Sequence, residues 1–100
     1  MAVTPPQFLL HNDGDNVAVA MDDLQPGTLH GLSVHEQTKY EAVLNHAIPL
    51  GHKFALTDIP EGEFIIKYGI KVGLASAPIK KGDYVHTHNM RSYRWEASRA

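Results

Sequence analysis

A histidine and a lysine follow one another at a turn in the middle of the chain, and this pair is the first place where the sequence could do chemistry. His52 and Lys53 come directly after the Pro and Gly turn at residues 49–51, within a stretch (residues 45–69) that alternates short apolar segments with turns. An ammonium beside an imidazole can hold a carboxylate or a sulfonate, with the histidine as a second donor or an acid. We therefore expect His52 and Lys53 to act in catalysis and to contact the substrate. An exposed basic dipeptide is the alternative interpretation.

A second group of polar residues closes the last apolar segment of the chain. His86 and His88 are separated by one residue and are followed by Asn89. Residues two apart in a strand point to the same face with Cα atoms about 6–7 Å apart, so two imidazoles in a strand over residues 84–89 can converge on a metal ion or an anion. Asn89 adds a side-chain amide for substrate binding. A solvated surface face explains the same triplet.

His11 completes the set of candidate residues because it also lies where a predicted strand meets a turn. If these strand ends meet at one edge of a sheet, His11 joins His52 and Lys53 in contacting the substrate. The same position makes His11 a candidate metal ligand together with His86 and His88.

The composition sets limits on the chemistry. The chain has seven histidines against nine Lys and Arg, and it has no cysteine, so a metal would be bound by imidazole, carboxylate or carbonyl groups. The formal net charge of −2 gives no electrostatic case for binding nucleic acid. The apolar runs are far shorter than the ~20 residues that cross a bilayer, and the N-terminus lacks a charged, then apolar, signal segment. We expect no membrane partner and a cytoplasmic location.

The candidate residues are positioned by short strands. Segments that are apolar or alternate with a period of two, bounded by Gly and Pro, predict strands at residues 7–11, 16–21, 39–45, 53–57, 63–68, 71–75 and 84–89. Both faces of residues 16–21 are apolar, which is typical of a central buried strand. No window has a sustained helical period. The sequence predicts one small all-β domain.

A turn pattern recurs three times along these strands. An aliphatic residue, two turn residues, a glycine and a polar residue occur around Gly27, Gly62 and Gly82, and each glycine is expected to take a positive φ. The spacings between these glycines are unequal, so the pattern is either a weak internal repeat or reuse of one turn chemistry.

We divide the chain into a lead-in with the first strand at residues 1–10, the domain proper at 11–89 and a tail at 90–100. The tail carries Tyr93 and Trp95 among three arginines. It is either a frayed end or an aromatic anchor to another chain. The sequence contains no nucleophile elbow, Gly-rich phosphate loop or metalloprotease helix. A domain of this kind is better suited to completing a site with a partner, or in a homo-oligomer, than to forming one alone.

Four blocks of the sequence resemble a known family. Residues 15–20, 51–59, 66–69 and 85–89 look like the N-terminal SAF domain of the altronate and galactarate dehydratases, and the likeness runs from about His11 to Asn89. The ending at residues 91–95 looks more like a small subunit of the sulfolactate sulfo-lyases.

The resemblance implies a β-clip fold and a role as the small subunit or domain of a hydro-lyase that dehydrates a sugar acid. It also implies a much larger catalytic subunit or domain as partner, and a divalent metal ion (Fe²⁺, Mn²⁺ or Mg²⁺) in the full enzyme, bound mainly by that partner. Two other functions stay open: the small subunit of a sulfolactate sulfo-lyase, and a non-catalytic module that binds a sugar acid or another anion. A purely structural subunit is a further possibility.

Overall fold

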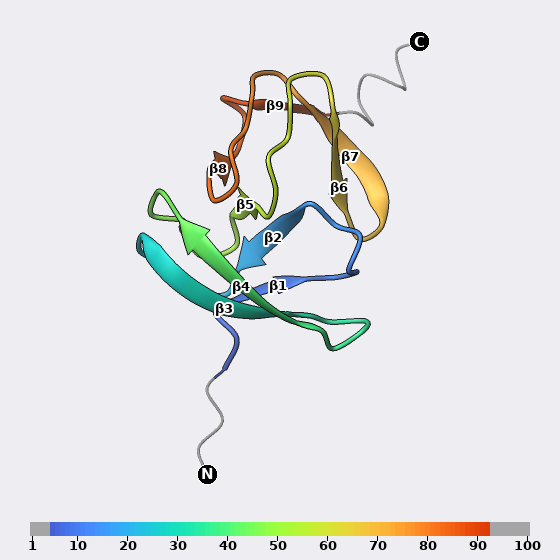
Figure 1. Cartoon of the computed structure of the whole chain (residues 1–100). Helices are drawn as coiled ribbons and strands as arrows, with labels where there is room; N and C mark the ends of the chain where they lie inside the picture. The colour runs from blue at the N-terminus through green and yellow to red at the C-terminus, as the bar shows by residue number, and fades with distance from the viewer. Residues whose placement is uncertain (1–4, 93–100) are drawn as a thin grey trace.

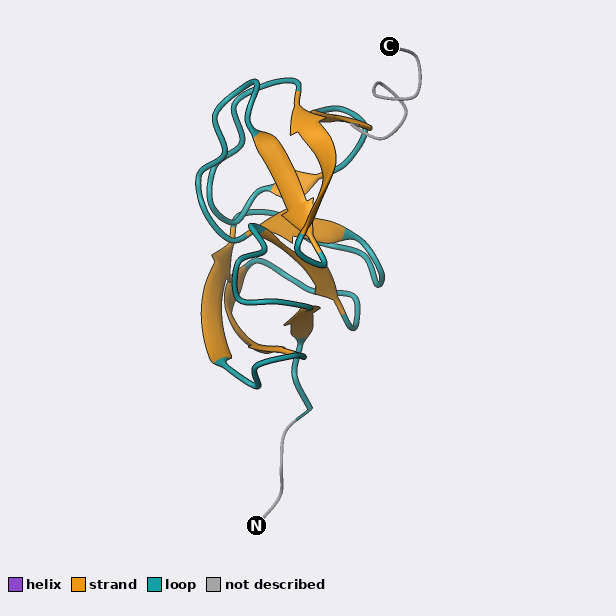
Figure 2. Ribbon diagram, turned by 90° about the vertical axis from the view of Figure 1, so that its right-hand side faces the viewer, coloured by secondary structure: helices purple, strands orange, loops and turns teal. Residues whose placement is uncertain are grey.

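The computed structural model describes residues 5–92, which form nine short strands and no helix (Figures 1 and 2). The all-β class predicted from the sequence is therefore confirmed. The strands are β1 (Phe8–Leu10), β2 (Val17–Ala20), β3 (Gly27–Ser33), β4 (Lys39–Leu44), β5 (Lys53–Ala55), β6 (Phe64–Lys67), β7 (Ile70–Ala75), β8 (Tyr84–Val85) and β9 (Met90–Ser92).

The strands form two curled sheets that lie one above the other (Figure 1). The larger sheet has the order β4-β3-β1-β2-β5-β8, and the smaller sheet has the order β6-β7-β9. Every pairing is antiparallel except that of β1 with β3. Strand β5 therefore lies between β2 and β8 near one edge of the larger sheet, which places His52 and Lys53 beside residues 84–89.

The first core lies on one face of the larger sheet. Phe8 and Phe54 are fully buried at its centre, with ring centroids 5.1 Å apart in an edge-to-face arrangement. Burial of each ring contributes roughly 1.5–3 kcal/mol. Tyr40, Ala42 and Leu44 of β4 face this core, as the alternating pattern predicted.

A second core fills the space between the two sheets. Val17 of β2 and Val85 of β8 belong to it, whereas Ala18 and Ala20 belong to the first core. Strand β2 is thus buried on both faces, which confirms the central strand predicted at 16–21. The second core consists of Val17, Ala55, Ile59, Ile65, Ala75, Ile79 and Val85.

The recurrent turns act in pairs. The predicted positive φ is confirmed at Gly27, Gly62 and Gly82, and Gly51 takes it as well. The aliphatic residues that open the turns form isolated antiparallel bridges, Leu24 with Ile48 in the first core and Ile59 with Ile79 in the second. The repeat therefore has a structural role: each pair of turns contributes two buried aliphatic side chains to one core.

Two segments differ from the strands predicted by sequence. Strand β3 was missed because His30, Gly31 and Ser33 interrupt its apolar pattern; Gly31 lies against the ring of Phe8, where a Cβ atom would collide with it. Met90–Ser92, which we assigned to the tail, forms β9 and pairs with β7. The aromatic residues of the tail lie outside the described residues.

Two side chains at the start of β2 fasten the smaller sheet to the larger one. The amide of Asn16 accepts a hydrogen bond from Ile66 N (2.7 Å) and donates one to Phe64 O (2.9 Å), so it pairs with β6 as a strand would. Asp15 is buried and accepts hydrogen bonds from the turn between β6 and β7. These contacts fix the hairpin above one end of β2.

Candidate functional site

His52 and Lys53 point to opposite faces of the larger sheet. Phe54 and Tyr84 are paired residues of β5 and β8, and the ring of His52 lies beside that of Tyr84 on the same face. Lys53 is paired with Val19 of β2, so its side chain leaves from the other face. The sequence interpretation treated the two residues as one tight pair, but the alternation of side chains along a strand separates them into two clusters.

The first cluster, the His–Tyr cluster, consists of His52, Tyr84, His86 and His88. The Tyr84 hydroxyl lies 2.6 Å from His52 Nδ1. The ring of His86 stacks on Tyr84, with centroids 5.5 Å apart, and lies 5.2 Å from the ring of His52. The ring of His88 lies 5.9 Å from Tyr84. Because Tyr84 occupies Nδ1 of His52 in either tautomer, Nε2 is left to exchange a proton with a bound molecule.

Asn89 holds the segment that carries the two histidines. Its side-chain oxygen accepts a hydrogen bond from His86 N (2.9 Å), and its side-chain nitrogen donates one to Tyr84 O (2.8 Å). Strand β8 therefore ends at Val85, and residues 86–89 form a turn instead of the predicted strand. The prediction that His86 and His88 share a strand face was wrong for this reason. Each of these two atoms can form one further hydrogen bond, but Asn89 is only 7% exposed, and the substrate contact expected of it stays a prediction.

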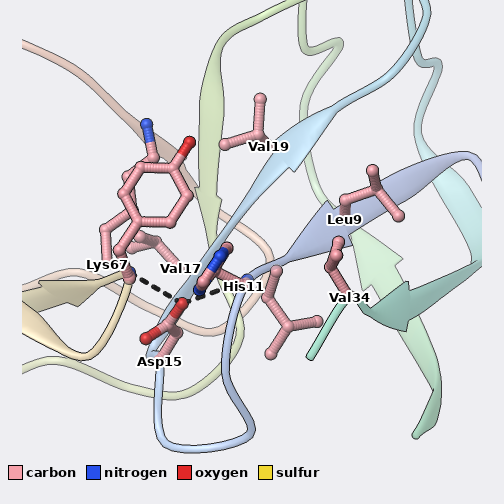
Figure 3. A pocket seen from close by; sticks show the side chains of 9 residues that line it. Leu9, His11, Asp15, Val17, Val19, Val34 and Lys67 are labelled. Atoms are coloured by element: carbon pink, nitrogen blue, oxygen red, sulfur yellow. Dashed lines mark hydrogen bonds between the residues drawn. The ribbon is translucent and has the colours of Figure 1, made fainter. Parts of the chain in front are cut away.

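His11 lies away from the His–Tyr cluster, in a second cluster with Tyr68 and His35. Its ring makes an edge contact with Tyr68, with centroids 4.9 Å apart, and stacks more loosely on His35 at 6.4 Å. The expected gathering of His11 with His52 is not found. His11 instead lines a cavity of about 200 Å³ between the two sheets (Figure 3).

This cavity, the inter-sheet pocket, combines an apolar floor with polar residues at its rim. It is lined by Leu9, Leu10, His11, Asp15, Val17, Val19, Val34, Lys67 and Tyr68. Asp15 is 5% exposed, and its carboxylate accepts hydrogen bonds from the backbone N–H groups of His11 (3.2 Å), Asn12 (3.2 Å), Tyr68 (3.0 Å) and Gly69 (2.8 Å). These bonds hold Tyr68 in a left-handed conformation with a φ of 59°.

Lys53 lies next to this pocket through its pairing with Val19. Partial burial lowers the pKa of the Lys53 ammonium, and the positive charge of Lys67 lowers it further. Val19, the register partner of Lys53, and Lys67 both line this pocket, so the two lysines approach it from different strands. Of the residues singled out in the sequence, His11 lines this pocket and Lys53 is paired with a lining residue, and the structure adds Lys67 and Tyr68.

A complete metal site is not found among residues 5–92. No group of three or more His, Asp or Glu side chains in that range could hold a metal ion. The predicted ligands are divided, with His11 in the inter-sheet pocket and His86 and His88 in the His–Tyr cluster. The described residues therefore do not fit a metal site built by this domain alone.

Sequence reasoning missed Asp15, Lys67, Tyr68 and Tyr84. Tyr84 could have been found, because it precedes His86 by two residues in a predicted strand and so shares its face. Asp15 and Tyr68 are brought together by the packing of two sheets, and no local pattern reports that.

Residues 5–92 contain no helix of the length and apolarity needed to cross a bilayer.

Comparison with known proteins identifies the domain. The family model described as the altronate/galactarate dehydratase SAF domain matches residues 6–93. The chain belongs to this family. The resemblance seen in the sequence is confirmed, and the arrangement described above is that of a SAF domain.

The relatives of this SAF domain are of two kinds. Altronate dehydratase of Escherichia coli is 50% identical over 86 residues, which are 86% of this chain but 16% of that enzyme. Galactarate dehydratase (L-threo-forming) of the same organism is 36% identical over 83 residues, 15% of its length. The (2R)-sulfolactate sulfo-lyase subunit alpha of Chromohalobacter salexigens is 33% identical over 90 residues, 96% of its length. The chain therefore spans a small part of the dehydratases and nearly the whole of the sulfo-lyase subunit.

Proposed function

We propose that this SAF domain is the small part of a cytoplasmic lyase that removes water from a sugar acid, and that a large catalytic chain or domain completes the active site. The observation that carries the proposal is the 50% identity to altronate dehydratase, in which the matching region is 16% of the enzyme. The described residues contain proton-exchanging groups but no complete metal site, which supports a divided active site. Metal dependence stays a prediction, with the ligands supplied mainly by the partner.

His52 is the residue of this chain that we expect to act in the reaction. Dehydration breaks a C–H bond beside the carboxylate and a C–O bond on the next carbon, forms the C=C bond of an enol and releases water. One group must take the proton and another must protonate the leaving hydroxyl. The Nε2 atom of His52 suits either task, and Tyr84 fixes the orientation of the ring by its bond to Nδ1.

The test is to co-express the chain with a large dehydratase-like chain of the same organism and to measure formation of the keto-deoxy acid from altronate. We expect His52→Ala to lower kcat by about 10²- to 10⁴-fold. Tyr84→Phe keeps the ring packing but removes the hydroxyl that orients the His52 ring, so it should lower kcat less than His52→Ala does, with KM unchanged. His30→Ala is the matched control, because His30 is exposed and contacts Glu41 on the distant β3–β4 pair. Full turnover by a correctly folded His52→Ala enzyme would falsify the role of His52.

A second function is favoured by one observation. The match covers 96% of the sulfo-lyase subunit alpha, so the matched region corresponds to nearly the whole of that subunit. The chain would then help to expel sulfite from sulfolactate, with His52 facing the sulfonate. Parallel assays of the same complex on altronate, galactarate and sulfolactate decide between the two, since we expect one substrate to be turned over far faster than the others.

A further inference from the structure

The inter-sheet pocket has a chemical character that differs from the His–Tyr cluster. Leu9, Val17 and Val19 of the larger sheet, with Val34, form an aliphatic floor (Figure 3). Val34 is 43% exposed and Tyr68 at the rim is 53% exposed. The pocket is therefore a concave apolar surface open to solvent, with positively charged groups along one side.

Two lysines contribute that charge. Lys67 lines the pocket, and its Nζ lies 4.8 Å from the ring centroid of Tyr68. Lys53 is paired with Val19, which also lines the pocket, and the charge of Lys67 acts on it. Within residues 5–92 neither lysine has an ion pair. Two neighbouring cations that are partly removed from water gain free energy when an anion binds between them.

The carboxylate of Asp15 is not the anion that binds between Lys53 and Lys67. Asp15 is the one carboxylate among the residues that line the pocket, and its two oxygens already accept four backbone hydrogen bonds. Its charge is balanced by those N–H dipoles and is buried below the rim. The ammonium groups of Lys53 and Lys67 remain available to a ligand.

We propose that the inter-sheet pocket binds a carboxylate that carries a short aliphatic group, with the carboxylate between Lys53 and Lys67 and the aliphatic group on Leu9, Val19 and Val34. A sugar acid is a poor fit, because its hydroxyl groups would lose their hydrogen bonds to water on this floor. The site is therefore separate from the catalytic site proposed above. The same chemistry is offered by a free short-chain acid and by an acidic side chain beside a leucine in a partner chain.

The test uses the whole isolated chain and does not depend on a catalytic partner. Backbone amide shifts are followed by NMR during titration with isovalerate, with gluconate and with the capped peptide Leu-Glu-Leu, each against sodium chloride at equal ionic strength. We expect isovalerate or the peptide to shift the amides around Val19, Lys53 and Lys67 and to saturate, and gluconate to bind at least about fivefold more weakly. Tighter binding of the peptide assigns the site to a partner chain, and tighter binding of isovalerate assigns it to a free acid.

The β6–β7 hairpin supplies a test residue, Lys67, and a matched control, Lys71. Lys67→Met and Lys53→Met keep the aliphatic stem and should each weaken binding about three- to tenfold. Lys71→Met is the control: its Nζ lies 4.3 Å from the ring centroid of Phe64, but it does not line the pocket. The proposal is overturned if neither probe shifts these amides more than sodium chloride does, or if Lys71→Met weakens binding as much as Lys67→Met. Either result leaves the proposed lyase function untouched.

Discussion

The carboxylate of Asp15 joins two loops that are far apart in the sequence, and its replacement by asparagine gives a quantitative prediction. Its oxygens accept four backbone hydrogen bonds, two from the turn after β1 and two from the hairpin turn at Tyr68 and Gly69. In Asp15→Asn, one oxygen can keep three of these as neutral bonds, while the new amide group faces the N–H of Gly69. A hydrogen bond to a charged group contributes about 1.5–3 kcal/mol and a neutral one about 1 kcal/mol, so replacing four charged bonds by three neutral ones should cost at least about 3 kcal/mol.

This loss is large for a domain of this size, whose free energy of unfolding is roughly 5–15 kcal/mol. A loss of about 3 kcal/mol should lower Tm by roughly 12–24 °C, and a larger loss should lower it further. Urea denaturation followed by far-UV circular dichroism measures the free energy directly. The matched control is Asp13→Asn in the same turn. The two oxygens of exposed Asp13 accept one hydrogen bond each from the Thr38 and Tyr40 hydroxyls, and an asparagine can accept from one hydroxyl and donate to the other.

We expect the Asp13→Asn protein to unfold close to the wild-type midpoint. If Asp15→Asn also unfolds there, the four bonds do not hold the two sheets together and the reasoning is wrong. Equal losses in both variants would show instead that charge in this turn, and not burial at Asp15, determines stability.

Two further predictions concern the turns and the lysine of β5. Gly62 and Gly82 have nearly equal positive φ values (89° and 88°), but a Cβ atom has open space at Gly62 and would collide with Val43 O at Gly82. Gly62→Ala should cost about 1 kcal/mol and Gly82→Ala about 2 kcal/mol more in urea denaturation, and equal costs would contradict the close approach. Because burial lowers the pKa of Lys53, the folded state loses that proton before the unfolded state as pH rises, and stability increases between the folded and unfolded pKa values. Lys53→Met should lack this rise in stability and should be more stable than wild type near neutral pH. The control Lys71→Met should keep the rise. If the stability of Lys53→Met and of wild type depends on pH in the same way, the burial of the Lys53 charge does not affect stability.

The strands with simple patterns were predictable from the sequence. The alternation in β4 and the two apolar faces of β2 report which side chains are buried, and both are confirmed. Strand β3 was not predictable in this way, because Gly31 is conformationally unfavourable in a strand and is explained by the ring of Phe8 above it. The bonds of the Asn89 amide shorten β8, and a competition between a side chain and a strand is not visible in hydrophobic periodicity.

The candidate site was predictable to a similar extent. The residue types at His52, Lys53 and His11 indicated polar loop chemistry, but adjacency in sequence was read as adjacency in space. The alternation of a strand already implies the opposite for His52 and Lys53, since consecutive residues face opposite sides. Spacing could relate Tyr84 to His86, but the bond between Tyr84 and His52 and the position of Lys67 at the pocket required the arrangement of the strands to be known.

The position of β5 gives a functional meaning to the placement of His52 and Lys53 on opposite faces of the larger sheet. Strand β5 lies between central β2 and edge strand β8. On the β2 side, Val19 lines the inter-sheet pocket, and on the β8 side, Tyr84 belongs to the His–Tyr cluster. A ligand held by Lys53 therefore approaches from a different side than a molecule that exchanges a proton with His52. If both proposals hold, Lys53→Met should weaken carboxylate binding while leaving kcat of the assembled enzyme within about twofold, and His52→Ala should do the reverse. A kcat that falls equally in both variants would mean that the two faces serve one site, and the division proposed for β5 would be wrong.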